Sequence, residues 1–110
     1  MPEIDSFTHD GRHYSLAKVR VMLRTQTAFL LPIEKLLWVQ DHDAFDEDRV
    51  VNAKIRWPLI VTKWKDPKTG KTKWTVVDGL HRLERYRRRG IKRIPCKEVT
   101  SEMLKKALIS

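Results

Sequence analysis

Two β-rich runs, residues 58–64 and 74–77, constrain the fold most strongly, because only the turn sequence KDPKTG (65–70) separates them. Pro67 presets the backbone of such a turn, and Gly70 accepts a positive φ at no steric cost. This pattern predicts a β-hairpin. The second run leads directly into Asp78 and Gly79, after which residues 80–89 favour a helix whose inward stripe is Leu80, Leu83 and Tyr86 or Arg87. Gly90 is placed to end that helix.

The segments around the hairpin alternate between strand and helix patterns. Residues 28–31 predict a strand, 33–37 a helical turn, 46–56 a helix with Val50, Ala53 and Ile55 or Trp57 inward, 94–99 a strand, and 101–108 a helix capped by Thr100 or Ser101. Residues 15–23 fit either a helix or a strand. We therefore predict one α+β domain over residues 28–110, with a mixed sheet, a β-hairpin and three to four helices, preceded by an N-terminal arm or extension at residues 1–27.

Composition narrows the class of protein. The chain has 110 residues, of which 41% are hydrophobic, enough for a single core. No stretch approaches the roughly 18 apolar residues of a spanning helix, so we expect no membrane partner. A lone cysteine, Cys96, cannot form an internal disulfide, and the N-terminus has no signal-peptide pattern. We therefore expect a cytoplasmic protein.

The positive charge is concentrated in one part of the chain. The 23 basic and 14 acidic residues give a net charge of +9, and residues 63–93 alone carry twelve of the basic residues against three acidic ones. Such a field attracts anions, so nucleic acid and nucleotides are both candidate partners. The candidate DNA-binding residues in this segment are Lys63, Lys65, Lys71, Lys73, Arg85, Arg88 and Arg89. The alternative is that these long side chains only solubilise a hairpin and a helix face.

The junction between the hairpin and the following helix is the main candidate site. The first amides of a helix lack partners and lie at the positive end of its dipole, and Gly79 has no side chain to block a phosphate. Cations at this end oppose the dipole by roughly 0.3 to 1 kcal/mol each, a conflict that an anionic ligand would relieve. Arg85 and Arg89 follow Arg82 on one helix face and predict a cationic approach. The candidate phosphate-binding residues are Asp78, Gly79, Leu80, His81 and Arg82. In the structural alternative, Asp78 is a plain N-cap and the arginines are solvated.

This junction resembles a known superfamily. The sequence VDGLHR (77–82), followed by RGIKRIPC (89–96), resembles the ParB/sulfiredoxin superfamily, in which a hairpin leads into a glycine-led phosphate loop and then a strand ending in Ile-Pro. The catalytic cysteine of sulfiredoxins falls at Leu80, which makes that activity an unfavourable assignment, and we expect Cys96 to be a core residue. Gly79 and Arg82 match the motif that binds CTP in ParB proteins. Free serine kinases carry a similar motif, which this chain matches at Asp78, Gly79, His81 and Arg82.

The resemblance implies phosphate chemistry. We predict binding of ATP, ADP or CTP with Mg²⁺ and either hydrolysis or phosphoryl transfer, with Asp43 and His81 as candidate catalytic residues and Asp78 and Asp43 as candidate metal ligands. His42 and Asp43 stand near the place where the kinases have a histidine and a glutamate. The alternatives are a ParB-like DNA-binding protein or nuclease that uses the basic surface of residues 63–93, and an interaction protein without catalysis. A phage or plasmid origin would suit so small a chain, and the oligomeric state stays open.

The tryptophans around the hairpin have two interpretations. Trp57, Trp64 and Trp74 are placed to stack on nucleobases beside the lysines. Aromatic residues in a hairpin more commonly pack in the core or across strands, and we favour that interpretation.

Overall fold

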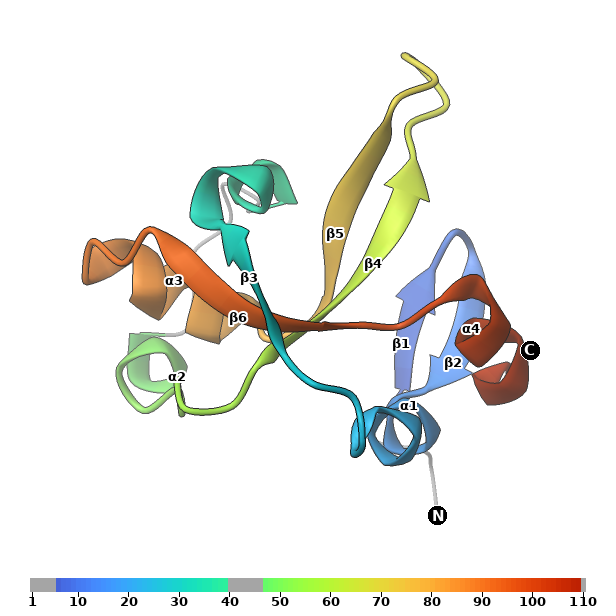
Figure 1. The fold of residues 1–110 in the computed structure, drawn as a ribbon, viewed down its shortest axis with the longest axis horizontal. Helices are drawn as coiled ribbons and strands as arrows, with labels where there is room; N and C mark the ends of the chain where they lie inside the picture. The colour runs from blue at the N-terminus through green and yellow to red at the C-terminus, as the bar shows by residue number, and fades with distance from the viewer. Residues whose placement is uncertain (1–5, 40–46, 110) are drawn as a thin grey trace.

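A four-stranded mixed sheet forms the centre of the molecule, as the computed structural model shows for residues 6–39 and 47–109 (Figure 1). Its strands run in the order β3 (Phe29–Pro32), β6 (Arg93–Glu98), β4 (Leu59–Lys65) and β5 (Thr72–Asp78). The β4–β6 pair is parallel, and the β3–β6 and β4–β5 pairs are antiparallel. The predicted α+β class, with its mixed sheet and its hairpin, is confirmed.

Short helices flank the sheet. The described residues contain the α-helices α1 (Leu16–Leu23), α2 (Glu47–Val51), α3 (Leu80–Arg88) and α4 (Ser101–Ala107), and the 3-10 turns η1 (Ile33–Lys35) and η2 (Leu37–Val39). The longest of these, α3, has nine residues. None of the helices in the described ranges is therefore long enough to cross a bilayer.

The sheet separates two hydrophobic clusters. Successive residues of a strand point to opposite faces, and in β4 Leu59 and Val61 pack in one cluster while Ile60 packs in the other. The first cluster also holds Leu83 and Tyr86 of α3, which are the inward residues of that helix, whereas Leu80 is 40% exposed. Cys96 is fully buried there, which confirms its place in the core.

The N-terminal segment is part of the fold. Strands β1 (Ser6–His9) and β2 (Arg12–Ser15) pair as a hairpin, and α1 follows with Ser15 as its N-cap. Val19 and Leu23 of α1 are buried with residues of α4 and with Ile60 in the second cluster. The helical spacing of residues 15–23 is thus the correct interpretation. Strand patterns in residues 6–15 are too short for the sequence to predict, which explains why the segment was expected to be an arm.

The helix predicted over 46–56 is wrong in its extent. Helix α2 ends at Val51, and Trp57 lies outward with 53% of its surface exposed. The carbonyls that a longer helix would use internally accept bonds from α3 instead: Arg85 donates to the carbonyls of Val51 and Ala53, and the Tyr86 hydroxyl donates to that of Ile55. Because these carbonyls accept hydrogen bonds from side chains of α3, the segment between α2 and β4 does not need helical hydrogen bonds and is irregular.

Candidate functional site

The junction between β5 and α3 has the backbone of an anion-binding turn. Gly79 is the N-cap of α3 with φ of 113°, and it makes no side-chain capping bond. A Cβ at this position would lie 3.0 Å from Cγ of Leu59, so only glycine fits without strain. The first turn of α3 contains no acidic residue. The N-cap residue therefore offers no side chain to the first amides of α3, which lie at the positive end of the helix dipole.

An open pocket of about 470 Å³ lies at this helix start. All five residues predicted to bind phosphate line it, and so do cations from α2 and from the segment after it. The lining residues are Arg49, Ala53, Lys54, Trp57, Val77, Asp78, Gly79, Leu80, His81 and Arg82. The structure thus brings the predicted residues together and adds Arg49 and Lys54, which no local motif identified.

Arg82 and Asp78 are held in place by neighbours. Arg82 Nη1 donates to the carbonyl of Pro58 at 3.1 Å, and its Nη2 lies 4.0 Å from the Asp78 carboxylate. Arg20 Nη2 of α1 lies 3.3 Å from the same carboxylate. Asp78 is therefore not the N-cap of α3, and it orients two guanidinium groups at the pocket wall.

A second pocket, of about 380 Å³, adjoins the first. The two pockets share Trp57, Asp78 and Arg82. The second adds three cations, Arg20 and Arg24 from α1 and its C-terminal side and Lys97 from β6. Sequence reasoning missed these residues, because α1 and β6 are distant in sequence and meet the junction only in the folded chain.

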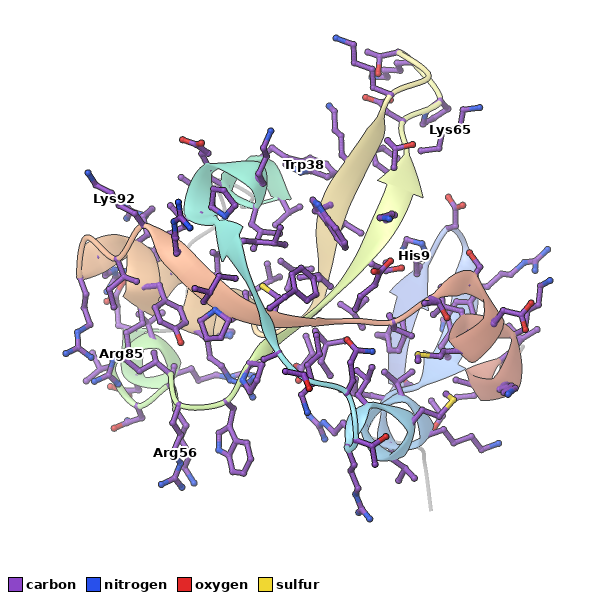
Figure 2. All side chains as sticks on the ribbon, viewed as in Figure 1. His9, Trp38, Arg56, Lys65, Arg85 and Lys92 are labelled. Atoms are coloured by element: carbon purple, nitrogen blue, oxygen red, sulfur yellow. The ribbon has the colours of Figure 1, made fainter. Side chains whose placement is uncertain are left out.

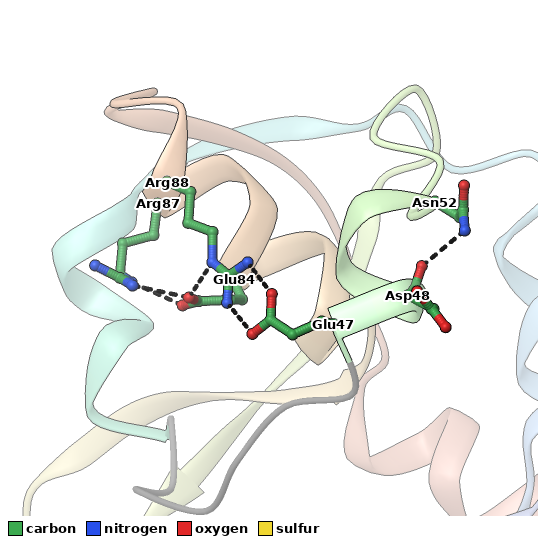
Figure 3. Close-up of polar contacts among 6 residues, drawn as sticks. All are labelled: Glu47, Asp48, Asn52, Glu84, Arg87 and Arg88. Carbon is green, nitrogen blue, oxygen red and sulfur yellow. Dashed lines mark hydrogen bonds and ion pairs between the residues drawn. The ribbon is translucent and has the colours of Figure 1, made fainter.

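The far end of α3 uses its arginines differently (Figure 3). Glu84 is 3% exposed and pairs with Arg87 and with Arg88, each at 2.7 Å. Arg88 also donates to both oxygens of Glu47, at 2.7 and 2.8 Å. Hydrogen bonds from Arg87, with those from Arg88 and the two positive charges, lower the pKa of Glu84 to about 2 despite its burial. Arg88 thereby links α3 to Glu47 of α2.

This arrangement changes the interpretation of the predicted DNA-binding residues. Arg85 bonds backbone carbonyls and Arg88 bonds two carboxylates, so neither lines the pockets at the α3 start. Of the cationic approach expected from Arg82, Arg85 and Arg89, Arg82 lines both pockets, and the other cations in their lining come from α1 and its C-terminal side, from α2 and the segment after it, and from β6. Lys65, at the outer part of the hairpin, and Arg85 lie far apart in the molecule (Figure 2).

The hairpin carries an aromatic and basic cluster. Trp38 of η2 stacks on Trp64 with centroids 5.5 Å apart, and its indole N–H donates to the Trp74 carbonyl. Lys73 lies over Trp38 and Lys63 over Trp74, while Lys65 and Lys71 are exposed. Trp64 thus stacks on Trp38 and Trp74 packs against the first hydrophobic cluster, in line with the packed interpretation that we favoured, and Trp57 is the exposed member of the predicted set.

Other predicted groups contribute less to the site. Burial raises the pKa of the Cys96 thiol to about 12, so it is not a nucleophile at neutral pH. Asp43 and His42 lie outside the described residues. Within the described ranges, no three histidine, cysteine or carboxylate side chains cluster as metal ligands would.

The similarity of this chain to known proteins lies in structure and not in sequence. No family model and no curated protein matches the sequence. The fold is similar to the crystal structure of C-terminally truncated chromosome-partitioning protein ParB from Caulobacter crescentus complexed with CTP-γ-S, with a TM-score of 0.46 and 22% identity. The match covers 72% of this chain and 49% of that one, so the chain spans about half of that ParB structure. At this similarity the match assigns no family, ligand or site to this chain.

Proposed function

We propose that this protein binds the phosphates of a nucleotide at the start of α3. The observation that carries the proposal is the coincidence of a helix start whose N-cap is a glycine at φ of 113° and a pocket with Arg49, Lys54 and Arg82 in its lining. A phosphate placed there would accept hydrogen bonds from the backbone and relieve the conflict between these cations and the helix dipole. His81, in the same pocket, would supply a further donor.

Trp57 gives the pocket a place for a nucleobase. Its ring is 53% exposed, it lines both pockets, and the Arg56 guanidinium lies 5.6 Å from its centroid. A base stacked on this ring would lie beside the phosphate-binding turn. Because stacking is tolerant of base identity, we expect ATP and CTP to bind with similar affinity.

The described residues fit the phosphates better than they fit magnesium. Mg²⁺ is held by one or two carboxylates together with phosphate oxygens and water. Asp78 is the one described carboxylate in the pocket lining, and it already pairs with Arg20. When bound with a nucleotide, the ion would neutralise phosphate charge and so supply the chemistry of hydrolysis or phosphoryl transfer, which we include in the proposal as the activity to test.

A thermal-shift screen tests the binding. ATP, ADP and CTP, each with and without magnesium, should raise the melting temperature of the full chain, and Arg82→Ala should remove the rise. Because Arg82 also holds the Pro58 carbonyl, Lys54→Gln is the second variant: its side chain is exposed at the pocket rim, so the fold should persist while the shift shrinks.

The matched control is Lys92→Gln, which removes an exposed lysine outside both pockets and should leave the shift unchanged. Release of inorganic phosphate from ATP or CTP, measured alongside, tests the catalytic part of the proposal. The absence of a shift with every nucleotide would contradict the binding proposal, and a shift without phosphate release would restrict it to binding.

A further inference from the structure

A groove distant from the α3 junction carries the second concentration of cations. It has a volume of about 440 Å³ and lies between the outer half of β4, the β1–β2 hairpin and α4 (Figure 1). Its lining includes Arg12 from β2, Lys63 and Lys65 from β4, and Lys105 from α4, against one carboxylate, that of Asp10. Four cations from three separate elements therefore face a single space.

The topology of the sheet leaves this groove open. The β4–β6 pairing ends at Val61, where the chain after β6 turns away, with the Val99 amide donating to the Val61 carbonyl and the Thr62 hydroxyl donating to that of Val99. Beyond that point β4 is paired only with β5 in the described part of the chain. The groove thus runs along an open strand edge, where peptide groups add to the side-chain donors.

Internal acids neutralise little of this charge. The Nζ of Lys63 lies 4.0 Å from Oε2 of Glu98, and the Lys63 side chain remains 59% exposed. Arg12, Lys65 and Lys105 are exposed, and none has an ion pair within 4.0 Å among the described residues. This contrasts with Arg87 and Arg88, whose charges Glu84 and Glu47 satisfy. Cations gathered without acids around a groove attract a polyanion.

We infer that this groove binds the sugar–phosphate backbone of single-stranded nucleic acid. Lys63 and Lys65 stand at alternate positions of one strand, about 6.7 Å apart along it, and so repeat along the groove as phosphates repeat along an extended strand. Trp64 also lines the groove.

An acidic peptide is the competing occupant, and the observations favour it less. A strand-adding peptide gains specificity from apolar pockets for its alternate side chains. Of the large apolar residues in the lining, Tyr14 and Leu104 are buried and Trp64 is half-buried. Leu108 is 41% exposed. The charge also continues past the groove to Lys68 and Lys71 at the hairpin tip, which suits a long polyanion.

The test is fluorescence-anisotropy titration of the full chain with labelled oligothymidylate over a series of salt concentrations. The triple variant Arg12→Gln, Lys65→Gln, Lys105→Gln should bind about tenfold more weakly, and the slope of log K against log salt should fall by about 2, because three phosphate contacts are lost. The matched control, Lys18→Gln, Lys35→Gln, Lys92→Gln, has the same net charge and exposed positions outside the groove, and it should retain the slope of the unmodified chain.

Three results would overturn the inference. The first is equal loss of affinity in both triple variants, which would mean that net charge alone drives binding. The second is tighter binding of oligoglutamate than of oligothymidylate, with the same dependence on the three groove cations, which would assign the groove to acidic peptides. The third is no oligonucleotide binding at low salt. Retention of the nucleotide-induced thermal shift by the groove variant would show that the two sites are separate.

Discussion

The two ends of helix α3 carry the same type of side chain and use it for different purposes. At the C-terminal end, Arg87 and Arg88 pair with the buried Glu84, and Arg88 also pairs with Glu47 of α2 and so links the two helices. At the N-terminal end, Arg82 is anchored to a backbone carbonyl and lies in the lining of two open pockets. Arginine content alone therefore does not identify a binding surface, and the positions of the carboxylates decide which cations are available.

The largest loss of stability is expected from a substitution at the N-terminal end of α3. Gly79→Ala should lower the free energy of unfolding by about 2 to 3 kcal/mol, because alanine at φ of 113° is strained and its Cβ would lie 3.0 Å from Leu59. Gly90→Ala at the other end of α3 is the matched control. It has φ of 70° and nothing within 4 Å of the added atom, so about 1 kcal/mol is expected. Chemical denaturation measures both, and equal losses would contradict the tight packing of the Gly79 turn.

Removing the acid at the C-terminal end should have the next largest effect. Glu84→Gln is expected to cost about 2 kcal/mol near neutral pH, a value discounted for solvent screening because Arg87 and Arg88 are 49% and 37% exposed. The folded pKa of about 2 lies below the ordinary value of 4.5 for glutamate, so the stabilisation is complete above pH 4.5 and is lost as pH falls toward 2. Denaturation as a function of pH should show the two proteins converging on acidification. A stability difference between the two proteins that stays constant down to pH 2 would contradict the stabilising role of the Glu84 ion pairs.

Trp57 sharpens the comparison, because it lies at the N-terminal pockets and contributes little to the core. Trp57→Ala should weaken nucleotide binding about tenfold, the value of one base stacked on an aromatic ring, while the melting temperature of the unliganded protein stays nearly unchanged. Trp57→Phe, which keeps an aromatic face, should recover most of the affinity. Isothermal titration calorimetry measures the nucleotide affinity of all three proteins. Unchanged affinity in Trp57→Ala would contradict the stacking of the base on Trp57.

The smallest effect is expected at the rim of the C-terminal cluster. Glu47 is exposed and receives two hydrogen bonds from Arg88, which lower its pKa. Glu47→Gln should therefore reduce the melting temperature less than Glu84→Gln does, and added salt should reduce the difference from the unmodified protein. Differential scanning calorimetry measures both melting temperatures. A decrease equal to that of Glu84→Gln would mean that the burial of Glu84 adds nothing to its contribution to stability.

Local signals explain why most of the fold could be predicted. The turn sequence with Pro67 and Gly70 specified the β4–β5 hairpin, and Thr100 caps α4 as expected. The start of α3 at Gly79 is equally local, because strand, glycine and helix follow one another directly. What the sequence could not predict depends on distant contacts: α2 ends early because Arg85 and Tyr86 bind the carbonyls beyond it.

The same distinction applies to the candidate site. Asp78 to Arg82 are contiguous, so a motif was enough to find them. Arg20, Arg24 and Lys97 reach the same place from α1 and β6, and no spacing in the sequence relates them to Gly79. Arg85 and Arg88 were grouped with the exposed lysines because the sequence does not reveal that Glu84 is buried or that Glu47 faces Arg88.

Backbone amide chemical shifts during titration with a nucleoside triphosphate test the central claim most directly. If the backbone amides at the start of α3 bind the phosphates, the largest perturbations in a ¹H–¹⁵N correlation spectrum should fall on Gly79, Leu80, His81 and Arg82, and Lys54→Gln should reduce them. Amides at the C-terminal end of α3 should move little. Perturbations centred on Lys65 and Lys105, with the Gly79 turn unmoved at saturation, would contradict the account.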